Sequence, residues 1–350
     1  MELEVFPSDF GLPALECDSL QFLACTKFCA APVRVVSKLS PWQSPTGEYP
    51  VFRDGEGAVI TDFEKFTDYL RHNAQDVVLD GDLTTSEKNE LYAFSCMLKN
   101  RLYPAQLFAL WMDDNNFNTV SNHWFASNLT FPYNMYYVQR RRKAAIAYLR
   151  NMHPGKLTTD AEIEFAVTRQ ALFCINMLAT KLGDKKYFYG DKPSSLDALV
   201  FGYLAPLLKL PLPSDRLQQH LKSCPNLVRF VESIISIYLP LTDDELSKQR
   251  RARDRWDLRR LKAQEAMKRK RIRDQELKTQ EANAAKESGE FHLRDTILFG
   301  VAAVTLTVLF AVHTGLITIT RVDRASEVDS EMASLPAGMD FQNAFSSEYD

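Results

Sequence analysis

The sequence predicts an α/β part followed by an all-helical part, then a long charged helix and a single membrane-spanning helix. Three observations predict this fold class. Short apolar runs alternate with helical patterns up to about residue 80, helical periodicity alone continues to about residue 240, and an uncharged apolar stretch lies near the C-terminus. We therefore expect domains at 1–80 and 81–240, a basic helical linker at 241–290, a membrane helix at 296–320 and an acidic tail at 321–350.

The composition is typical of a folded protein in a reducing compartment. Hydrophobic residues make up 45% and charged residues 25% of the 350 residues, which is enough to bury the cores of two domains. The six cysteines are scattered through apolar stretches and do not form a small disulfide framework. The N-terminus carries acids and no basic segment, so we expect neither a secretory signal nor a matrix-targeting presequence.

The α/β part is predicted from the order of its short elements. Apolar runs at 3–6 and 32–39 are typical of strands, and a Gly/Asp turn between two apolar runs indicates a hairpin at 49–61. Helical spacing of apolar residues indicates helices at 15–31 and 62–73. The order strand, helix, strand, hairpin, helix is the layout of half a thioredoxin-like domain.

The all-helical part carries helical periodicity almost throughout. Apolar residues recur at helical spacing in 86–111 and in 159–183. The second of these helices is expected to begin at a capping pair, Thr159 and Glu162, and to end at Gly183. We find no internal repeat, so a single helical domain is expected.

A long helix is predicted over 242–288, because this stretch contains no Gly or Pro. Thr242 and Glu245 form a capping box at its start, and Gly289 lies at its far end. No apolar heptad is sustained along it, so a coiled coil is not favoured.

Within this helix, residues 248–273 carry 13 Lys and Arg against 3 acids. Such a run is typical of a solvated helix, or of a surface that contacts anionic lipid or an acidic partner. Nucleic acid is disfavoured, because Trp256 is the only aromatic residue in the run.

A membrane anchor is predicted from Thr296 to Thr320, which contains no Asp, Glu, Lys or Arg. Its 25 residues, at about 1.5 Å of rise each, are enough to cross a hydrocarbon core about 30 Å thick. A buried core helix is the alternative, but no compact segment follows to cover it. The cations precede the span, whereas residues 321–350 carry 7 acids and 2 Arg, so we expect a tail-anchored protein whose N-terminal bulk faces the cytosol.

One capping box suggests a fold family. The stretch GDKPSSLDALVFGYLAP contains Ser194 and Asp197 in an S-x-x-D box at the start of an apolar helix. In this two-part layout the box resembles that of the glutathione-transferase C-terminal domain. The resemblance implies a thioredoxin-like domain joined to a glutathione-transferase-type helical domain, and it places Pro50 where such folds have a cis-proline.

Longer blocks resemble the metaxin family, its first and third members more than its second. They are SPWQSPTG (40–47), FALWMDDNNFNTVSNHWFASNLTFPYN (108–134), KYFYGDKPSSLDALVFGYLAPLLKLPLPSDRLQQHLKSCPNL (186–227) and the C-terminal span. The resemblance covers about residues 1–240 and resumes at the anchor. The basic helix has no clear counterpart in it.

The metaxin resemblance implies a location and a role. It implies a protein of the mitochondrial outer membrane, with its folded domains in the cytosol and its tail in the intermembrane space. It implies a non-catalytic binding platform that acts with the β-barrel sorting and assembly machinery in protein import and membrane insertion. The expected partners are a second metaxin subunit and the β-barrel assembly core, with β-barrel precursors, anionic lipids and transport adaptors as further candidates; no nucleic acid and no cofactor are expected.

A membrane-tethered glutathione-dependent transferase is the competing prediction. The resemblance implies that such an enzyme needs a Ser, Tyr or Cys at the start of the first helix and an acid–Ser pair after the hairpin. Here the pair reads Asp62-Phe63, and Phe63 has no hydroxyl. Cys17 is the candidate thiol, but Glu16 and Asp18 beside it disfavour a thiolate. We therefore predict no enzyme, and a degenerate glutathione site at Cys17, Asp62 and Phe63.

Other reactive motifs are not predicted. Cys25 and Cys29 are spaced C-x-x-x-C on an apolar helix, which indicates packed thiols and not a redox pair. The six histidines show no metal-ligand spacing, and the sequence contains no Gly-rich phosphate loop.

Overall fold

The computed structural model describes residues 1–73, 78–152 and 159–314, without the side chains of 285–293. The chain divides into two compact units, Met1–Ile272 and Arg273–Asp350. The first unit contains both the α/β part and the helical part.

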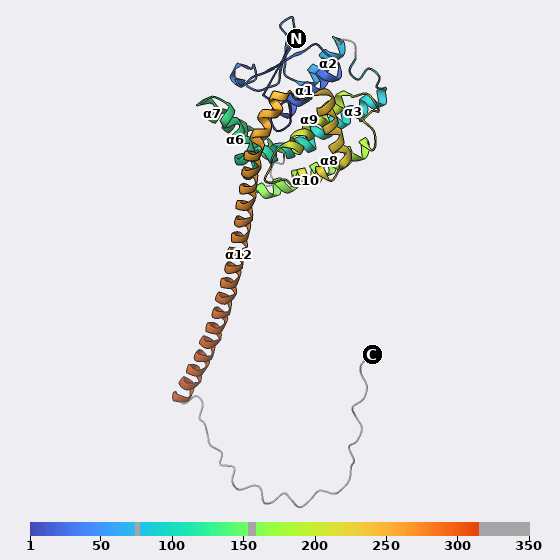
Figure 1. The fold of residues 1–350 in the computed structure, drawn as a ribbon. Helices are drawn as coiled ribbons and strands as arrows, with labels where there is room; N and C mark the ends of the chain where they lie inside the picture. Colours follow the sequence, from blue (N-terminus) through green and yellow to red (C-terminus); the bar gives the residue numbers. More distant parts are fainter. Residues whose placement is uncertain (74–77, 153–158, 315–350) are drawn as a thin grey trace, which may run out of the picture. The chain divides into compact units, whose positions relative to one another are not determined.

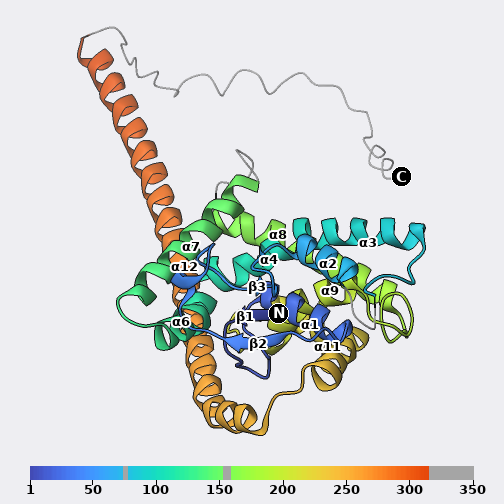
Figure 2. The same cartoon turned by 90° about the horizontal axis from the view of Figure 1, so that it is seen from above.

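The α/β part is built on a four-stranded sheet with the strand order β2-β1-β3-β4. Its elements are β1 (Glu2–Val5), α1 (Cys17–Phe28), β2 (Arg34–Ser37), β3 (Val51–Arg53), β4 (Val59–Ile60) and α2 (Phe63–His72). β1 pairs in parallel with β2 and antiparallel with β3, and β3 and β4 form the hairpin. Figure 2 shows β1 between β2 and β3, with α1 and α2 close by. The predicted α/β layout is confirmed.

Helix α1 lies at the centre of the first unit. Ten of its 12 residues are buried, because it packs against α2 on one side and against α9 (Ser195–Lys209) on another. Phe22 on α1 stacks on Phe66 of α2 with 4.2 Å between ring centroids, and Phe52 of the sheet lies 5.0 Å from Phe66. These rings join the sheet, α1 and α2 in one apolar core.

The helical part surrounds α9 and is confirmed as predicted. Its other helices are α3 (Thr85–Met97), α4 (Tyr103–Leu107), α5 (Asp114–Asn116), α6 (Asn122–Asn128), α7 (Tyr133–Met152), α8 (Asp160–Leu182), α10 (Arg216–Lys222) and α11 (Pro225–Tyr238). Thr159 and Glu162 cap α8 reciprocally, and Gly183 ends it with a φ of 53°.

The helix predicted over 86–111 is not uniform. The chain is helical from Thr85 to Met112, but π-helical turns replace α-helical ones at Leu98–Leu102 and Phe108–Met112. Pro104 follows the first of these turns and has no N–H to donate, so a regular α-helical ladder is interrupted there. A third π-helical turn, Phe117–Ser121, precedes α6.

The charged helix and the apolar stretch form one helix, α12 (Asp243–His313), of 71 residues (Figure 1). The capping box at its start has Thr242 N donating to Glu245 Oε2 at 2.9 Å and Glu245 N donating to Thr242 Oγ1 at 3.4 Å. The expected end at Gly289 is wrong, because the helix continues through this residue. A glycine inside a helix costs only about 1 kcal/mol, and good helix formers surround it here.

The last part of α12 contains the predicted anchor. Among the residues that the structure describes, Arg294–His313 is the one helix long and apolar enough to cross a membrane. The last residues of the predicted span, 315–320, and the acidic tail at 321–350 lie outside the described residues.

Candidate functional site

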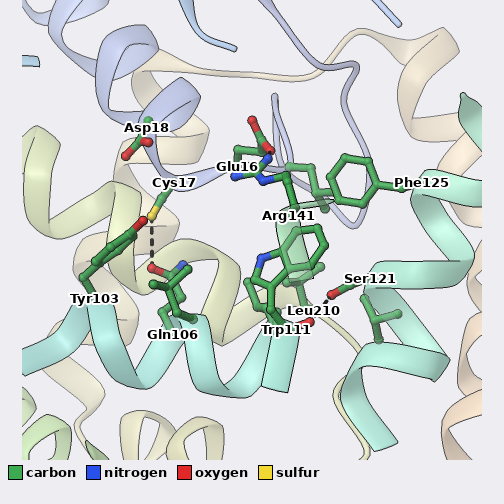
Figure 3. Close-up of a pocket in the computed structure, with 14 residues that line it drawn as sticks. Glu16, Cys17, Asp18, Tyr103, Gln106, Trp111, Ser121, Phe125, Arg141 and Leu210 are labelled. Carbon is green, nitrogen blue, oxygen red and sulfur yellow. Dashed lines mark hydrogen bonds and ion pairs between the residues drawn. The ribbon is translucent and has the colours of Figure 1, made fainter. Parts of the chain in front are cut away.

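Cys17, the candidate nucleophile, is the first residue of α1 and is 8% exposed. Its Sγ donates to Oε1 of Gln106 on α4 at 3.0 Å (Figure 3). Burial raises the pKa of the Cys17 thiol well above its usual range, and the charge of Asp18 raises it further. The residue is therefore a neutral, hydrogen-bonded thiol in this structure and not a thiolate.

We expect Cys17 to resist alkylation in the native protein, because iodoacetamide reacts with accessible thiolates. Mass spectrometry of the full-length chain after brief labelling measures the extent at each cysteine. Cys96 is the internal control, because it is half-buried on α3. Labelling of Cys17 as fast as Cys96 would contradict this assignment.

Asp62 and Phe63 lie at a different place from Cys17. Asp62 caps α2 by accepting from Lys65 N at 3.1 Å, and Phe63 packs edge-on against Phe22 with centroids 6.0 Å apart. Both line a cleft of about 580 Å³ between α1 and α2 on one side and α3 and α9 on the other. Cys17 does not line this cleft, whereas Asp18 does. The three residues predicted for one degenerate site are thus divided between two cavities.

The cleft is acidic and aromatic. Four acids line it, Asp18, Asp62, Glu64 and Asp68, together with the cations Arg71 and Lys99. Arg71 is already paired with Asp68 at 2.6 Å and with Asp80 at 2.7 Å. A negatively charged ligand such as glutathione would therefore meet mostly carboxylates, together with the apolar ring of Phe63.

The electrostatics of the cleft predict a pH dependence. The pKa of Asp18 is raised from 3.8 to about 6, first by the surrounding protein that displaces water and then by the charge of Asp62. Its side chain still reaches the solvent of the cleft, so screening limits the effect. A raised native pKa means that the folded state binds the proton more tightly, so this stabilisation is present below about pH 4 and is lost as pH rises through about 6.

We expect the free energy of unfolding of the wild type, minus that of Asp18→Asn, to fall as pH rises from about 4 to about 6 and then to stay constant. Denaturant unfolding of both proteins across this range measures it, with Asp191→Asn, an exposed acid outside the cleft, as the control. A difference that rises with pH would contradict the raised pKa.

A second, smaller cavity of about 70 Å³ lies at the start of α1, lined by Cys17, Glu16 and Arg141. Figure 3 shows the Arg141 guanidinium beside the Glu16 carboxylate and the ring of Trp111. The two charges form an ion pair, and the guanidinium lies 5.1 Å from the Trp111 ring centroid. Burial lowers the pKa of Arg141 to about 10, so it stays a cation at neutral pH. The pair holds α7 against α1.

The capping box of α9 is formed by buried groups. Asp197 is 0% exposed and accepts from Ser194 N at 2.8 Å, from Ser194 Oγ at 2.5 Å and from Phe188 N at 3.0 Å. The Tyr49-Pro50 peptide bond is cis, and so is Phe131-Pro132, which no sequence pattern indicated.

A connection between the two parts of the unit also escaped prediction. Asp80 accepts from Ser195 N at 2.8 Å and from Ser195 Oγ at 2.6 Å, and Arg71 of α2 pairs with the same carboxylate at 2.7 Å. It thereby joins α2 to the start of α9. The left-handed φ of 59° at Asp80 is a backbone feature that no sequence pattern signalled.

The His, Cys, Asp and Glu side chains and the cysteine pair of the first helix were the remaining candidates for metal or redox sites. No group of three or more His, Cys, Asp and Glu side chains is placed to hold a metal ion in the described part of the chain. Cys25 and Cys29 are both fully buried, and burial raises the pKa of each thiol.

Comparison with known proteins assigns the family. Residues 19–142 match the model of a family described as outer mitochondrial membrane transport complex protein, and residues 171–234 match that of the glutathione S-transferase C-terminal domain. Among solved structures, a glutathione S-transferase of Ceriporiopsis subvermispora in complex with glutathione covers 69% of this chain and 98% of its own, at 17% identity and a TM-score of 0.46.

The similar curated proteins agree with one another. A metaxin-1 homolog of Caenorhabditis briggsae is 51% identical over 329 residues, which is 93% of this chain and 100% of the relative. Metaxin-1 of Mus musculus is 35% identical over 70% of this chain and 77% of its own, and metaxin-3 of Danio rerio is 34% identical over 68% and 75%. The chain therefore belongs to the metaxin family, whose place is the outer mitochondrial membrane and whose role is protein transport.

Proposed function

We propose that the chain is a non-catalytic binding platform that acts with the β-barrel sorting and assembly machinery. The main support for this proposal is the environment of Cys17 and Phe63, two residues of the predicted degenerate glutathione site. Cys17 is buried, is bonded to Gln106 and lines a small cavity and not the cleft, while Phe63, which has no hydroxyl, lines the cleft. A scaffold that keeps its fold but loses its reacting groups is suited to holding partners.

The proposed partners are a second metaxin subunit and the β-barrel assembly core, with β-barrel precursors as the cargo. A pull-down of the tagged full-length chain from gently solubilised mitochondria, with mass spectrometry of the bound proteins, tests this. Joint recovery of a second metaxin and the assembly core is expected. Recovery of neither, from a protein that is still in the outer membrane, would contradict the platform.

The proposed orientation places the first unit in the cytosol and the tail at 321–350 in the intermembrane space. It is supported by the 13 cations of 248–273, which precede the anchor, since basic flanks stay on the cytosolic side. Protease treatment of intact mitochondria should remove an N-terminal epitope and spare a C-terminal one. Protection of the N-terminal epitope would contradict the proposed topology.

A glutathione-dependent transferase is the second candidate, because the cleft of about 580 Å³ remains open beside α1. Retention of the detergent-solubilised full-length chain on glutathione resin, with elution by free glutathione, would favour it. We expect no specific retention, since four carboxylates line the cleft.

Two further binding roles remain proposals. The cations of 268–273 are exposed on α12, and their replacement by Gln is expected to weaken attraction to anionic liposomes. Transport adaptors are a further class of partner, and the same pull-down would recover them.

A further inference from the structure

The first part of α12 folds back on the body of the first unit. Ser8 Oγ donates to Glu245 Oε1 at 2.6 Å, and Gly11 N donates to Gln249 Oε1 at 2.7 Å. Trp256 packs edge-on against Phe10, with ring centroids 4.9 Å apart. One turn further on, Arg260 pairs with Asp215, which precedes α10, at 2.8 Å. The stretch from Glu245 to Arg260 is therefore a fixed wall of this unit.

A cleft of about 400 Å³ lies between this wall and the segment from the end of α9 to α10. Its volume is within the range of small-molecule sites. Five cations line it, Lys209, Lys222, Arg250, Arg253 and Arg260, against two acids, Asp9 and Asp257.

The cations of the cleft are only partly neutralised. Lys209 pairs with Glu232 at 2.5 Å, and Arg260 pairs with Asp215. Lys222, Arg250 and Arg253 form no ion pair with any residue that the structure describes.

One of the two acids in the cleft, Asp9, already accepts hydrogen bonds from other groups. Asp9 accepts from Trp124 Nε1 and from Phe10 N, both at 2.8 Å. The cleft therefore carries excess positive charge that faces solvent.

Buried polar atoms without partners add a second, independent observation. Nε2 of Gln249 and Nε of Arg260 are buried donors that bond no group in the described part of the protein. Oε1 of Gln218, on a side chain only 2% exposed, is a buried acceptor in the same state. All three residues line the cleft. Leaving such atoms unpaired is costly, so a bound group that supplies both acceptors and a donor would satisfy them.

We propose that this cleft binds a phosphate ester that also carries a hydroxyl group. The phosphate oxygens accept from the two orphan donors and from Lys222, Arg250 and Arg253, because charge-assisted hydrogen bonds to phosphate suit guanidinium and ammonium groups. The hydroxyl donates to Gln218 Oε1. Both a glycerophospholipid headgroup and a soluble sugar or polyol phosphate have this chemistry. The site lies apart from the acidic cleft and does not depend on the proposed platform role.

The test is calorimetric titration of sn-glycerol 3-phosphate into the full-length protein in phosphatidylcholine nanodiscs. The variant Lys222→Gln/Arg250→Gln/Arg253→Gln changes only exposed side chains, so the fold should persist. Its matched control is Lys262→Gln/Arg269→Gln/Arg271→Gln, an equal charge change at exposed positions of α12 that do not line the cleft. We expect the cleft variant to weaken binding by about tenfold or more and the control by less than about twofold.

A second ligand and a second lipid composition test the role of the hydroxyl group and the source of the phosphate ester. Methyl phosphate, which has no hydroxyl, should bind more weakly than glycerol 3-phosphate. In nanodiscs that contain phosphatidylglycerol, a lowered apparent affinity for glycerol 3-phosphate identifies the lipid headgroup as the occupant, and an unchanged affinity identifies a soluble ester.

Other outcomes overturn the proposal. Equal losses in the cleft and control variants would mean general attraction to a basic helix. Absence of binding by wild type, with an acidic peptide captured through the same three cations, would assign the cleft to a polypeptide.

Discussion

Replacing Asp197 by Ala is expected to lower the free energy of unfolding by about 3 kcal/mol or more. The carboxylate is 0% exposed and accepts from Phe188 N at 3.0 Å and from Ser194 N at 2.8 Å. Alanine leaves both buried N–H groups without an acceptor, and each such loss costs about 1–3 kcal/mol. Denaturant unfolding of the full-length protein, followed by circular dichroism, measures the change.

Two comparisons separate this effect from ordinary helix capping. Ser194→Ala removes only the hydroxyl and should cost about 1 kcal/mol, as the loss of an N-cap normally does. Asp191→Ala, in the same loop but exposed, should change stability by less than about 0.5 kcal/mol. If Asp197→Ala were no worse than Ser194→Ala, the buried network would not hold α9 in place.

Gly202→Val is expected to destabilise the protein by about 2–4 kcal/mol. A Cβ at Gly202 would lie 2.7 Å from the carbonyl oxygen of Cys17 and would also overlap Cγ of Gln21. The two helices α1 and α9 touch at this point, so one backbone must move. At an open helical position the replacement of Gly by Ala would instead stabilise the protein by about 1 kcal/mol. A Gly202→Ala variant that is less stable than wild type would therefore already indicate the close approach of the two helices.

The double variant Gly202→Ala/Gln21→Ala identifies which neighbour matters. Removing the Gln21 side chain relieves one overlap and leaves the Cys17 carbonyl in place, so the rescue should be partial. Complete rescue would mean that the Gln21 side chain alone, and not the Cys17 carbonyl, prevents a Cβ at Gly202. A stabilising Gly202→Ala would show that α1 and α9 separate more easily than their geometry indicates.

Features that depend on neighbouring residues were predictable from the sequence. In the boxes Thr159/Glu162 and Thr242/Glu245 the partners are three positions apart, so a local pattern contains all the groups that bond. The helix end predicted at Gly289 was wrong, because a glycine ends a helix only where its own backbone adopts a left-handed conformation. The neighbouring residues alone do not decide this.

Features that join distant residues could not be read from the sequence. The bonds from Ser195 to Asp80 connect positions 115 residues apart, and the partner of the Cys17 thiol is 89 residues away at Gln106. The sequence placed Cys17 at the start of α1 but could not show that its thiol faces a small cavity instead of the cleft. Which side of a helix end meets which neighbour is decided by tertiary packing.

The π-helical turns at Leu98–Leu102 and Phe108–Met112 have a consequence for how this region tolerates length changes. Each holds one residue more than an α-helical turn, so deleting a single residue there restores α-helical bonding instead of breaking the helix. The flanking segments would then keep their facing, because a π-helical turn absorbs the residue that in a regular α-helix would rotate the following segment by about 100°. Gln106 lies between the two turns, so after a one-residue gap at Leu98–Leu102 it would still face the sulfur of Cys17. This region should therefore tolerate the loss of one residue while keeping the same side chains against α1.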